Sequence, residues 1–83
     1  MHDYDNYKYI GTQKIIDLSK KENELLKILI ENKGNIVLID TLLTNLFSKT
    51  LSVRALDQLV YRLRKKLKGE VTIRTRPGFG YGI

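Results

Sequence analysis

Hydrophobic residues recur at helical spacing in the second half of the chain. Leu56, Val60, Leu63 and Leu67 lie four, three and four residues apart, so an α-helix would gather them into one apolar stripe. We therefore predict a helix over residues 52–68 that buries this stripe. Its opposite face would carry cations, an amide and a phenol, namely Arg54, Gln58, Tyr61, Arg62 and Lys65. By itself, this pattern fits a partner-binding surface and a solvated surface helix equally well.

Two shorter helical patterns precede this one. Ser19 and Glu22 have the spacing of a capping box, in which each side chain bonds the backbone N–H of the other residue. We therefore predict a helix over residues 19–33, with a broad apolar face and with Gly34 as its stop. Leucines at helical spacing predict a second helix over residues 39–47.

The last two helices are predicted to follow each other closely. Residues 48–51 form a tight connection, Ser52 is a suitable N-cap for the helix over 52–68, and Gly69 would end that helix. Two consecutive helices joined by a short turn, of which the second is amphipathic and basic, are typical of a helix-turn-helix.

Short β-type runs lie at both ends of the chain. Residues 7–18 contain two aromatic or β-branched runs around Gly11, which predicts a hairpin whose tyrosines pack on the sheet rather than stack on bases. Residues 1–6 carry no pattern, and we expect them to be disordered. Residues 35–37 are long enough only for an edge strand or a connector.

A second hairpin is predicted over residues 71–83. Val71, Ile73 and Thr75 alternate with polar residues, and Pro77 and Gly78 then supply a turn. The glycines at 78, 80 and 82 lack the spacing and the following helix of a phosphate-binding loop, so we interpret them as allowing a tight hairpin. A basic helix followed by a terminal hairpin is the arrangement of a winged helix.

The positive charge is concentrated in the last part of the chain. The 83 residues, enough for one domain, carry a net charge of +6. Up to Val53, seven lysines balance seven acidic residues, whereas from Arg54 onward eight bases face two acids. This placement indicates a polyanionic partner, with nucleic acid the first choice and an anionic membrane surface the second.

No pattern of catalytic or metal-binding chemistry is apparent. The chain has no cysteine, and its one histidine, His2, has no evident partner for general-base or metal chemistry. No apolar run is long enough to span a membrane, and no signal peptide opens the sequence. We therefore expect a cytoplasmic protein that is not an enzyme and has no catalytic residues, metal or cofactor.

Three segments together resemble the OmpR/PhoB-type winged-helix DNA-binding domain of bacterial transcriptional regulators. Residues 18–26 (LSKKENELL) resemble the family's L-T-x-x-E-x-x-L-L motif. Residues 56–67 (LDQLVYRLRKKL) resemble its recognition helix, V-D-x-x-I-x-R-L-R-K-K-L. Residues 73–81 (IRTRPGFGY) resemble its wing, I-x-T-x-x-G-x-G-Y. The resemblance implies an α+β fold: a winged helix-turn-helix of three helices, with an N-terminal hairpin or small antiparallel sheet and a C-terminal hairpin wing.

The resemblance also implies roles for residues on the third helix and the wing. The helix would enter the major groove, where Arg62 would contact a base and Gln58 and Tyr61 a base or sugar. Phosphate contacts would fall to Arg54, Arg64 and Lys65, and wing contacts to Thr75 and Arg76. Asp57, beside Arg54 and Tyr61, would orient its neighbours.

Some positions depart from the family's pattern. Pro77 and Gly82 stand where arginines are common, which would either shift the minor-groove contact of the wing to Arg76 or weaken it. Asn23 replaces a usual aromatic residue behind the first helix, which would thin the core there.

Further partners follow from the same resemblance. They are double-stranded DNA, a second copy of the chain on direct-repeat sites, and RNA polymerase, although the connection at 48–51 is short where the family has a longer polymerase-contacting loop. The chain would be the output domain of a two-component response regulator with a separate receiver domain, a stand-alone protein, or the cytoplasmic part of a membrane-anchored regulator of the ToxR-like branch.

An alternative from another class is a basic interaction module that docks on an acidic protein or an anionic membrane surface. RNA binding is a weaker alternative, because only Tyr61 offers an aromatic ring on the basic face.

Overall fold

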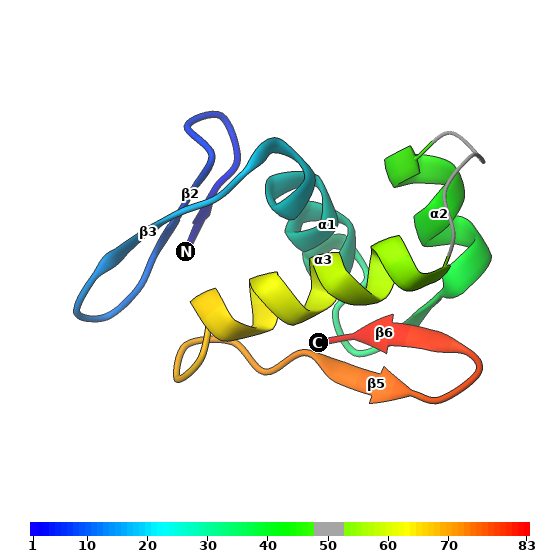
Figure 1. Ribbon diagram of the computed structural model, residues 1–83. Helices are drawn as coiled ribbons and strands as arrows, with labels where there is room; N and C mark the ends of the chain where they lie inside the picture. The colour runs from blue at the N-terminus through cyan, green and yellow to red at the C-terminus, as the bar shows by residue number, and fades with distance from the viewer. Residues whose placement is uncertain (48–52) are drawn as a thin grey trace.

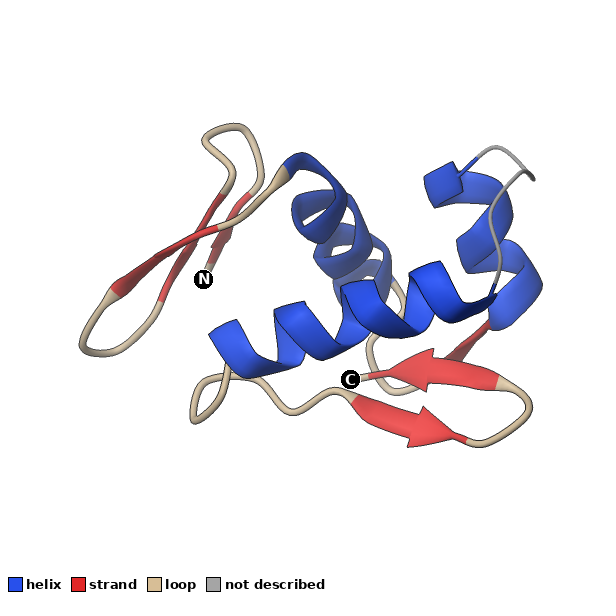
Figure 2. Cartoon of the chain, viewed as in Figure 1, coloured by secondary structure: helices blue, strands red, loops and turns tan. Residues whose placement is uncertain are grey.

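The described part of the chain forms three helices and two small antiparallel sheets, and the two sheets lie apart from each other beside the helices (Figure 1, Figure 2). The computed structural model describes residues 1–47 and 53–83. In this part of the chain, α1 spans Lys20–Glu31, α2 spans Ile39–Phe47 and α3 spans Val53–Lys66. The predicted tight connection and the Ser52 cap lie outside the described residues. The α+β winged-helix architecture is confirmed.

The N-terminal sheet has three strands, one more than the predicted hairpin. Strand β1 (His2–Asp3) pairs with β2 (Lys8–Ile10), which pairs with β3 (Ile15–Asp17), all antiparallel. The expectation that residues 1–6 are disordered is therefore wrong. The physical reason is that β1 finds backbone partners on β2, and the Ile10 amide also donates to the Met1 carbonyl at 2.7 Å.

Side chains of the first helix also hold the N-terminal segment. Asn23, which is buried on α1, lies 2.7 Å from the His2 ring through its Oδ1 and donates from Nδ2 to the Tyr4 carbonyl at 3.0 Å. Asn23, which was expected to thin the core, thus attaches the N-terminal segment to α1 through polar contacts instead. The tyrosines of the predicted hairpin were expected to pack on the sheet, and this holds for Tyr9, which packs against the core. Tyr7 instead lies exposed in the turn before β2, with a positive φ of 58°.

The capping box at the start of α1 is confirmed. The Glu22 amide donates to the Ser19 hydroxyl at 3.2 Å, and the Ser19 amide donates to the Glu22 carboxylate at 2.8 Å. The helix ends at Glu31, slightly before the predicted end, with Asn32 as its C-cap. Gly34 follows with a φ of +91°, in the left-handed region that glycine occupies without penalty.

The C-terminal sheet places the last strand in the middle. Strand β6 (Gly80–Gly82) pairs with the edge strand β4 (Ile36–Leu38) on one side and with β5 (Arg74–Arg76) on the other. Residues 35–37 were expected to form an edge strand or a connector, and the structure shows the edge strand; the terminal hairpin is confirmed. This hairpin runs alongside α3 (Figure 1).

Two glycines allow β6 to approach β4 closely. A Cβ atom at Gly80 would lie 1.9 Å from the Val37 carbonyl oxygen, and one at Gly82 would lie 2.4 Å from the Asn35 carbonyl oxygen. No side chain fits at either distance, so these glycines are required by backbone packing. At Gly82 this rules out, in the present packing, the arginine that is common in the family.

The predicted apolar stripe of α3 faces the core. Leu56, Val60, Leu63 and Leu67 are all buried, the last just beyond the end of the helix. They join leucines of α1 and α2 in one cluster, which also includes Ile73 and Tyr81 from the C-terminal hairpin segment. Burial of this stripe fixes which side of α3 remains exposed.

A buried carboxylate links the start of α1 to the end of α3. Glu22, whose side chain is only 4% exposed, accepts from Lys66 Nζ at 2.7 Å in addition to capping α1. Lys66 also donates to the Asp17 carbonyl at 3.1 Å. Burial alone would raise the pKa of Glu22, but the hydrogen bonds from Lys66 and from the Ser19 backbone outweigh it and hold the pKa below its ordinary value of 4.5.

We predict that Glu22→Gln lowers stability at neutral pH by about 1–3 kcal/mol, because it removes the charge that pairs with Lys66. The folded-state pKa lies below the unfolded value. The ion pair therefore stabilises the fold above about pH 4.5 and loses its effect as the pH falls further. Chemical denaturation from pH 7 down to about pH 3 should show a flatter profile for the variant. Glu31→Gln, at an exposed position on the same helix, is the control and should keep the wild-type profile.

We predict that Gly80→Ala costs about 3 kcal/mol or more, because the new methyl group would overlap the backbone of β4. Gly78→Ala is the matched control. Gly78 has a φ of +79° but no neighbouring atoms in the way, so alanine there should cost only about 1–2 kcal/mol. Thermal unfolding of both variants measures the difference. Equal losses would mean that the β4–β6 contact is looser than described.

Candidate nucleic-acid interface

The exposed side of α3 carries the predicted contact residues in one row. Arg54, Gln58, Tyr61 and Lys65 lie four, three and four residues apart, and all four are exposed, Tyr61 at 59%. The Lys65 ammonium lies 5.4 Å from the centre of the Tyr61 ring, which is a cation–π contact between residues one helical turn apart. The row lies opposite the buried stripe, so the fold presents cations, an amide and a phenol together.

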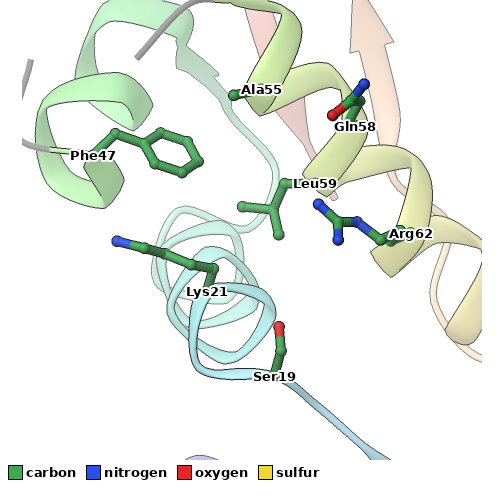
Figure 3. A pocket seen from close by; sticks show the side chains of 7 residues that line it. All are labelled: Ser19, Lys21, Phe47, Ala55, Gln58, Leu59 and Arg62. Atoms are coloured by element: carbon green, nitrogen blue, oxygen red, sulfur yellow. The ribbon is translucent and has the colours of Figure 1, made fainter. Parts of the chain in front are cut away.

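Arg62 lies beside this row, facing the other two helices. It lines a hollow with Gln58 of α3, Lys21 of α1 and Phe47 of α2 (Figure 3). The Lys21 ammonium donates to the Leu46 carbonyl at the end of α2 and lies 5.1 Å from the centre of the Phe47 ring. The hollow therefore adds a cation from α1 to the surface that Arg62 and Gln58 share.

Lys21 was not among the predicted site residues. The sequence did contain a signal for Lys21. A lysine in the first turn of a helix is disfavoured by the positive end of the helix dipole, so its presence there points to a role outside helix formation. Its position next to the third helix depends on how α1 packs, which the sequence pattern alone does not give.

Asp57 lies on the side of α3 that faces the hairpin wing. Its carboxylate accepts a hydrogen bond from the Tyr81 hydroxyl on β6. Burial and this hydrogen bond raise the pKa of Tyr81 to about 12. Asp57 was predicted to orient its helix neighbours Arg54 and Tyr61. Its carboxylate instead bonds the wing.

Arg64 makes a second connection between α3 and the wing. Its Nη2 donates to the Ile73 carbonyl at 2.7 Å and to the Thr75 hydroxyl at 2.8 Å. Both predicted residues, Arg64 and Thr75, are exposed, but their polar groups bond each other. The phosphate contact of Arg64 stays a prediction.

The tip of the wing combines a cation and an aromatic ring. The Arg76 guanidinium lies 5.6 Å from the centre of the Phe79 ring, which is 57% exposed. The Phe79 amide donates to the Arg76 carbonyl at 2.9 Å and closes the predicted turn. Phe79 was not predicted as a site residue. Its place directly after the predicted Pro-Gly turn could have indicated an exposed aromatic ring at the tip of the wing.

The described residues contain no cluster of three or more histidine, cysteine, aspartate or glutamate side chains placed to hold a metal ion. His2 bonds Asn23, so within the described residues its role is attachment of the N-terminal segment. Among the described helices, none has the length and apolarity needed to cross a membrane.

Comparison with known families decides the relationship. A family model described as "Transcriptional regulatory protein, C terminal" matches residues 11–83. The chain belongs to this family. The OmpR/PhoB-type resemblance of the three sequence motifs is thereby confirmed.

Relatives agree in both sequence and structure. The response regulator protein PmrA of Pseudomonas aeruginosa is 37% identical over 70 residues, which cover 82% of this chain and 31% of PmrA. The DNA-binding domain of Bacillus subtilis CssR is 32% identical with a TM-score of 0.85, covering 99% of this chain and 96% of that one. The Klebsiella pneumoniae RstA DNA-binding domain, solved in complex with the RstA box, is 30% identical with a TM-score of 0.84, covering 99% and 87%. The chain thus spans about a third of PmrA but nearly all of the CssR domain.

Proposed function

We propose that this domain binds double-stranded DNA in a sequence-specific manner and so regulates bacterial transcription. The observation that carries the proposal is the exposed row on α3, which lies opposite the buried stripe and beside the wing. An α-helix fits the major groove, where base edges differ between all four base pairs. The RstA domain, a relative of similar size and fold, was solved bound to its DNA box.

Within this proposal, each exposed side chain has a chemical role. Arg62 reads a guanine edge, because a guanidinium can form two parallel hydrogen bonds to it. Gln58 and Tyr61 contact a base or a sugar, whereas Arg54 and Lys65 hold phosphates and fix the register. On the wing, Thr75 and Arg76 reach the minor groove or the adjacent backbone.

The sizes of the relatives suggest the biological setting. PmrA is named a response regulator, and this chain matches only 31% of it. We infer that the domain is the output part of a two-component regulator in the cytoplasm, with a receiver domain as a further partner. Direct-repeat sites that hold two copies and a contact to RNA polymerase belong to the same proposal.

Docking on an anionic membrane is less compatible with the fold. A membrane-binding amphipathic helix inserts its apolar face, but the apolar face of α3 is buried in the core by Leu56, Leu63 and Leu67. An acidic protein partner would use the same cations as DNA. Gel-shift with duplex DNA, run beside co-sedimentation with anionic liposomes, separates these alternatives.

We predict that Arg62→Ala weakens binding to the selected DNA site by roughly 1–3 kcal/mol and relaxes preference at one base pair. The measurement is a binding titration on a site selected from random duplexes and on its single-base variants. Lys33→Ala, which removes an exposed cation just after α1, is the charge-matched control and should bind like the wild type. A uniform loss across all sequences would reassign Arg62 to the phosphate backbone.

We predict a different pattern for Arg54→Ala. Because Arg54 holds a phosphate, the variant should lose affinity equally on all sequences, and the slope of log K against log salt should become shallower by about 1. Titrations at several salt concentrations measure this slope. Binding of the wild type that does not depend on salt would contradict DNA binding through these cations.

A further inference from the structure

Two polar side chains of α3 point toward the wing instead of the exposed row. Asp57 and Arg64 are seven residues apart, which is two helical turns, or about 10 Å along the helix axis. They therefore share one side of the helix. That side faces β5 and β6, because Asp57 bonds Tyr81 and Arg64 bonds Ile73 and Thr75.

Their two partners face each other across the wing. Thr75 on β5 and Tyr81 on β6 are paired residues in the antiparallel register. The helix thus bonds both members of one cross-strand pair, through two of its residues that lie two helical turns apart. A hairpin held in this way cannot rotate away from α3 unless at least one of these bonds breaks.

The bond made by Arg64 depends on guanidinium geometry. One nitrogen, Nη2, donates both to the Thr75 hydroxyl at 2.8 Å and to the carbonyl of Ile73 at 2.7 Å, and Ile73 is itself anchored in the core. A lysine keeps the charge, but its ammonium has rotatable N–H donors on a flexible stem, so it would hold these two acceptors less rigidly than the planar guanidinium does. Charge and geometry can therefore be separated by substitution.

We propose that Asp57 and Arg64 are positioning residues that hold the wing at a fixed place relative to α3, so that both elements meet the DNA together. The proposal rests on the DNA-binding function proposed above. It assigns Arg64 an action through Thr75 and the wing rather than on a phosphate. Holding the wing in place before binding reduces the ordering cost of the wing contacts.

The test compares duplexes that include or lack the flank under the wing. The selected site is shortened one base pair at a time from each end until the wild type loses affinity, which marks the flank that the wing needs. Arg64→Lys should lose about tenfold, or about 1.4 kcal/mol, on the full duplex and almost nothing on the shortened one. Its salt slope should match that of the wild type, because the charge is retained. Lys33→Arg, the reverse exchange at an exposed position just after α1, is the control and should bind like the wild type on both duplexes.

Tyr81→Phe provides a second, independent variant. It removes the hydroxyl that Asp57 accepts from but keeps the ring, and it should show the same dependence on the wing flank. Thr75→Val combined with Arg64→Lys should lose less than the sum of the two single losses, because both changes remove the bond between Arg64 and Thr75. Circular dichroism melts confirm that each variant is folded at the assay temperature.

Several outcomes would overturn the proposal. These are wild-type affinity that is independent of the flank, Arg64→Lys binding like the wild type on the full duplex, and Arg64→Ala losing equally on both duplexes with a shallower salt slope. In the last case, Arg64 is a phosphate contact. If the wild type selects no DNA sequence at all, the DNA-binding function fails first. If the wild type selects a site but the affinity losses of Arg64→Lys and Tyr81→Phe do not depend on the wing flank, the positioning role alone is rejected.

Discussion

The orientation of α3 depends on burial of its apolar stripe. Leu56, Leu63 and Leu67 are fully removed from solvent and pack with leucines of α1 and α2. Each such side chain contributes about 1.5–3 kcal/mol through burial, so rotation of the helix about its axis would cost much of the stability of a domain this small. Because the stripe is fixed inward, the row from Arg54 to Lys65 is fixed outward.

Polar contacts then hold the helix on its two flanks. On one flank, Lys66 reaches the buried Glu22 carboxylate, which also caps α1. On the other flank, Asp57 and Arg64 reach Tyr81 and Thr75 of the wing. The same helix is therefore bonded to α1 on one side and to the C-terminal hairpin on the other, which leaves the exposed row and Arg62 to face a partner.

The cations from Arg54 onward therefore fall into two groups. Some of the cations of α3 serve the fold, since Lys66 and Arg64 bond groups on α1 and the wing. Others, such as Arg54 and Arg62, are exposed and suited to an anionic partner. A count of positive charge along the sequence cannot separate these two groups, because both kinds of residue raise the net charge equally.

The sequence alone determined the features that depend on neighbours along the chain. Helical spacing gave the buried stripe and the exposed row, the Ser19–Glu22 pair gave the start of α1, and the Pro77–Gly78 pair gave the turn of the wing. Each of these follows from local backbone geometry, so a short stretch of sequence is sufficient. The three family motifs extended this to the winged-helix fold.

Only the tertiary structure decided which distant residues meet. It paired His2–Asp3 with β2, gave the buried Asn23 its partners in the N-terminal segment, and brought Lys21 and Arg62 to the lining of one hollow. It also gave Asp57 and Arg64 their partners on the wing. These contacts join residues that are separated along the chain. They arise from packing of whole elements against one core, which no local periodicity specifies.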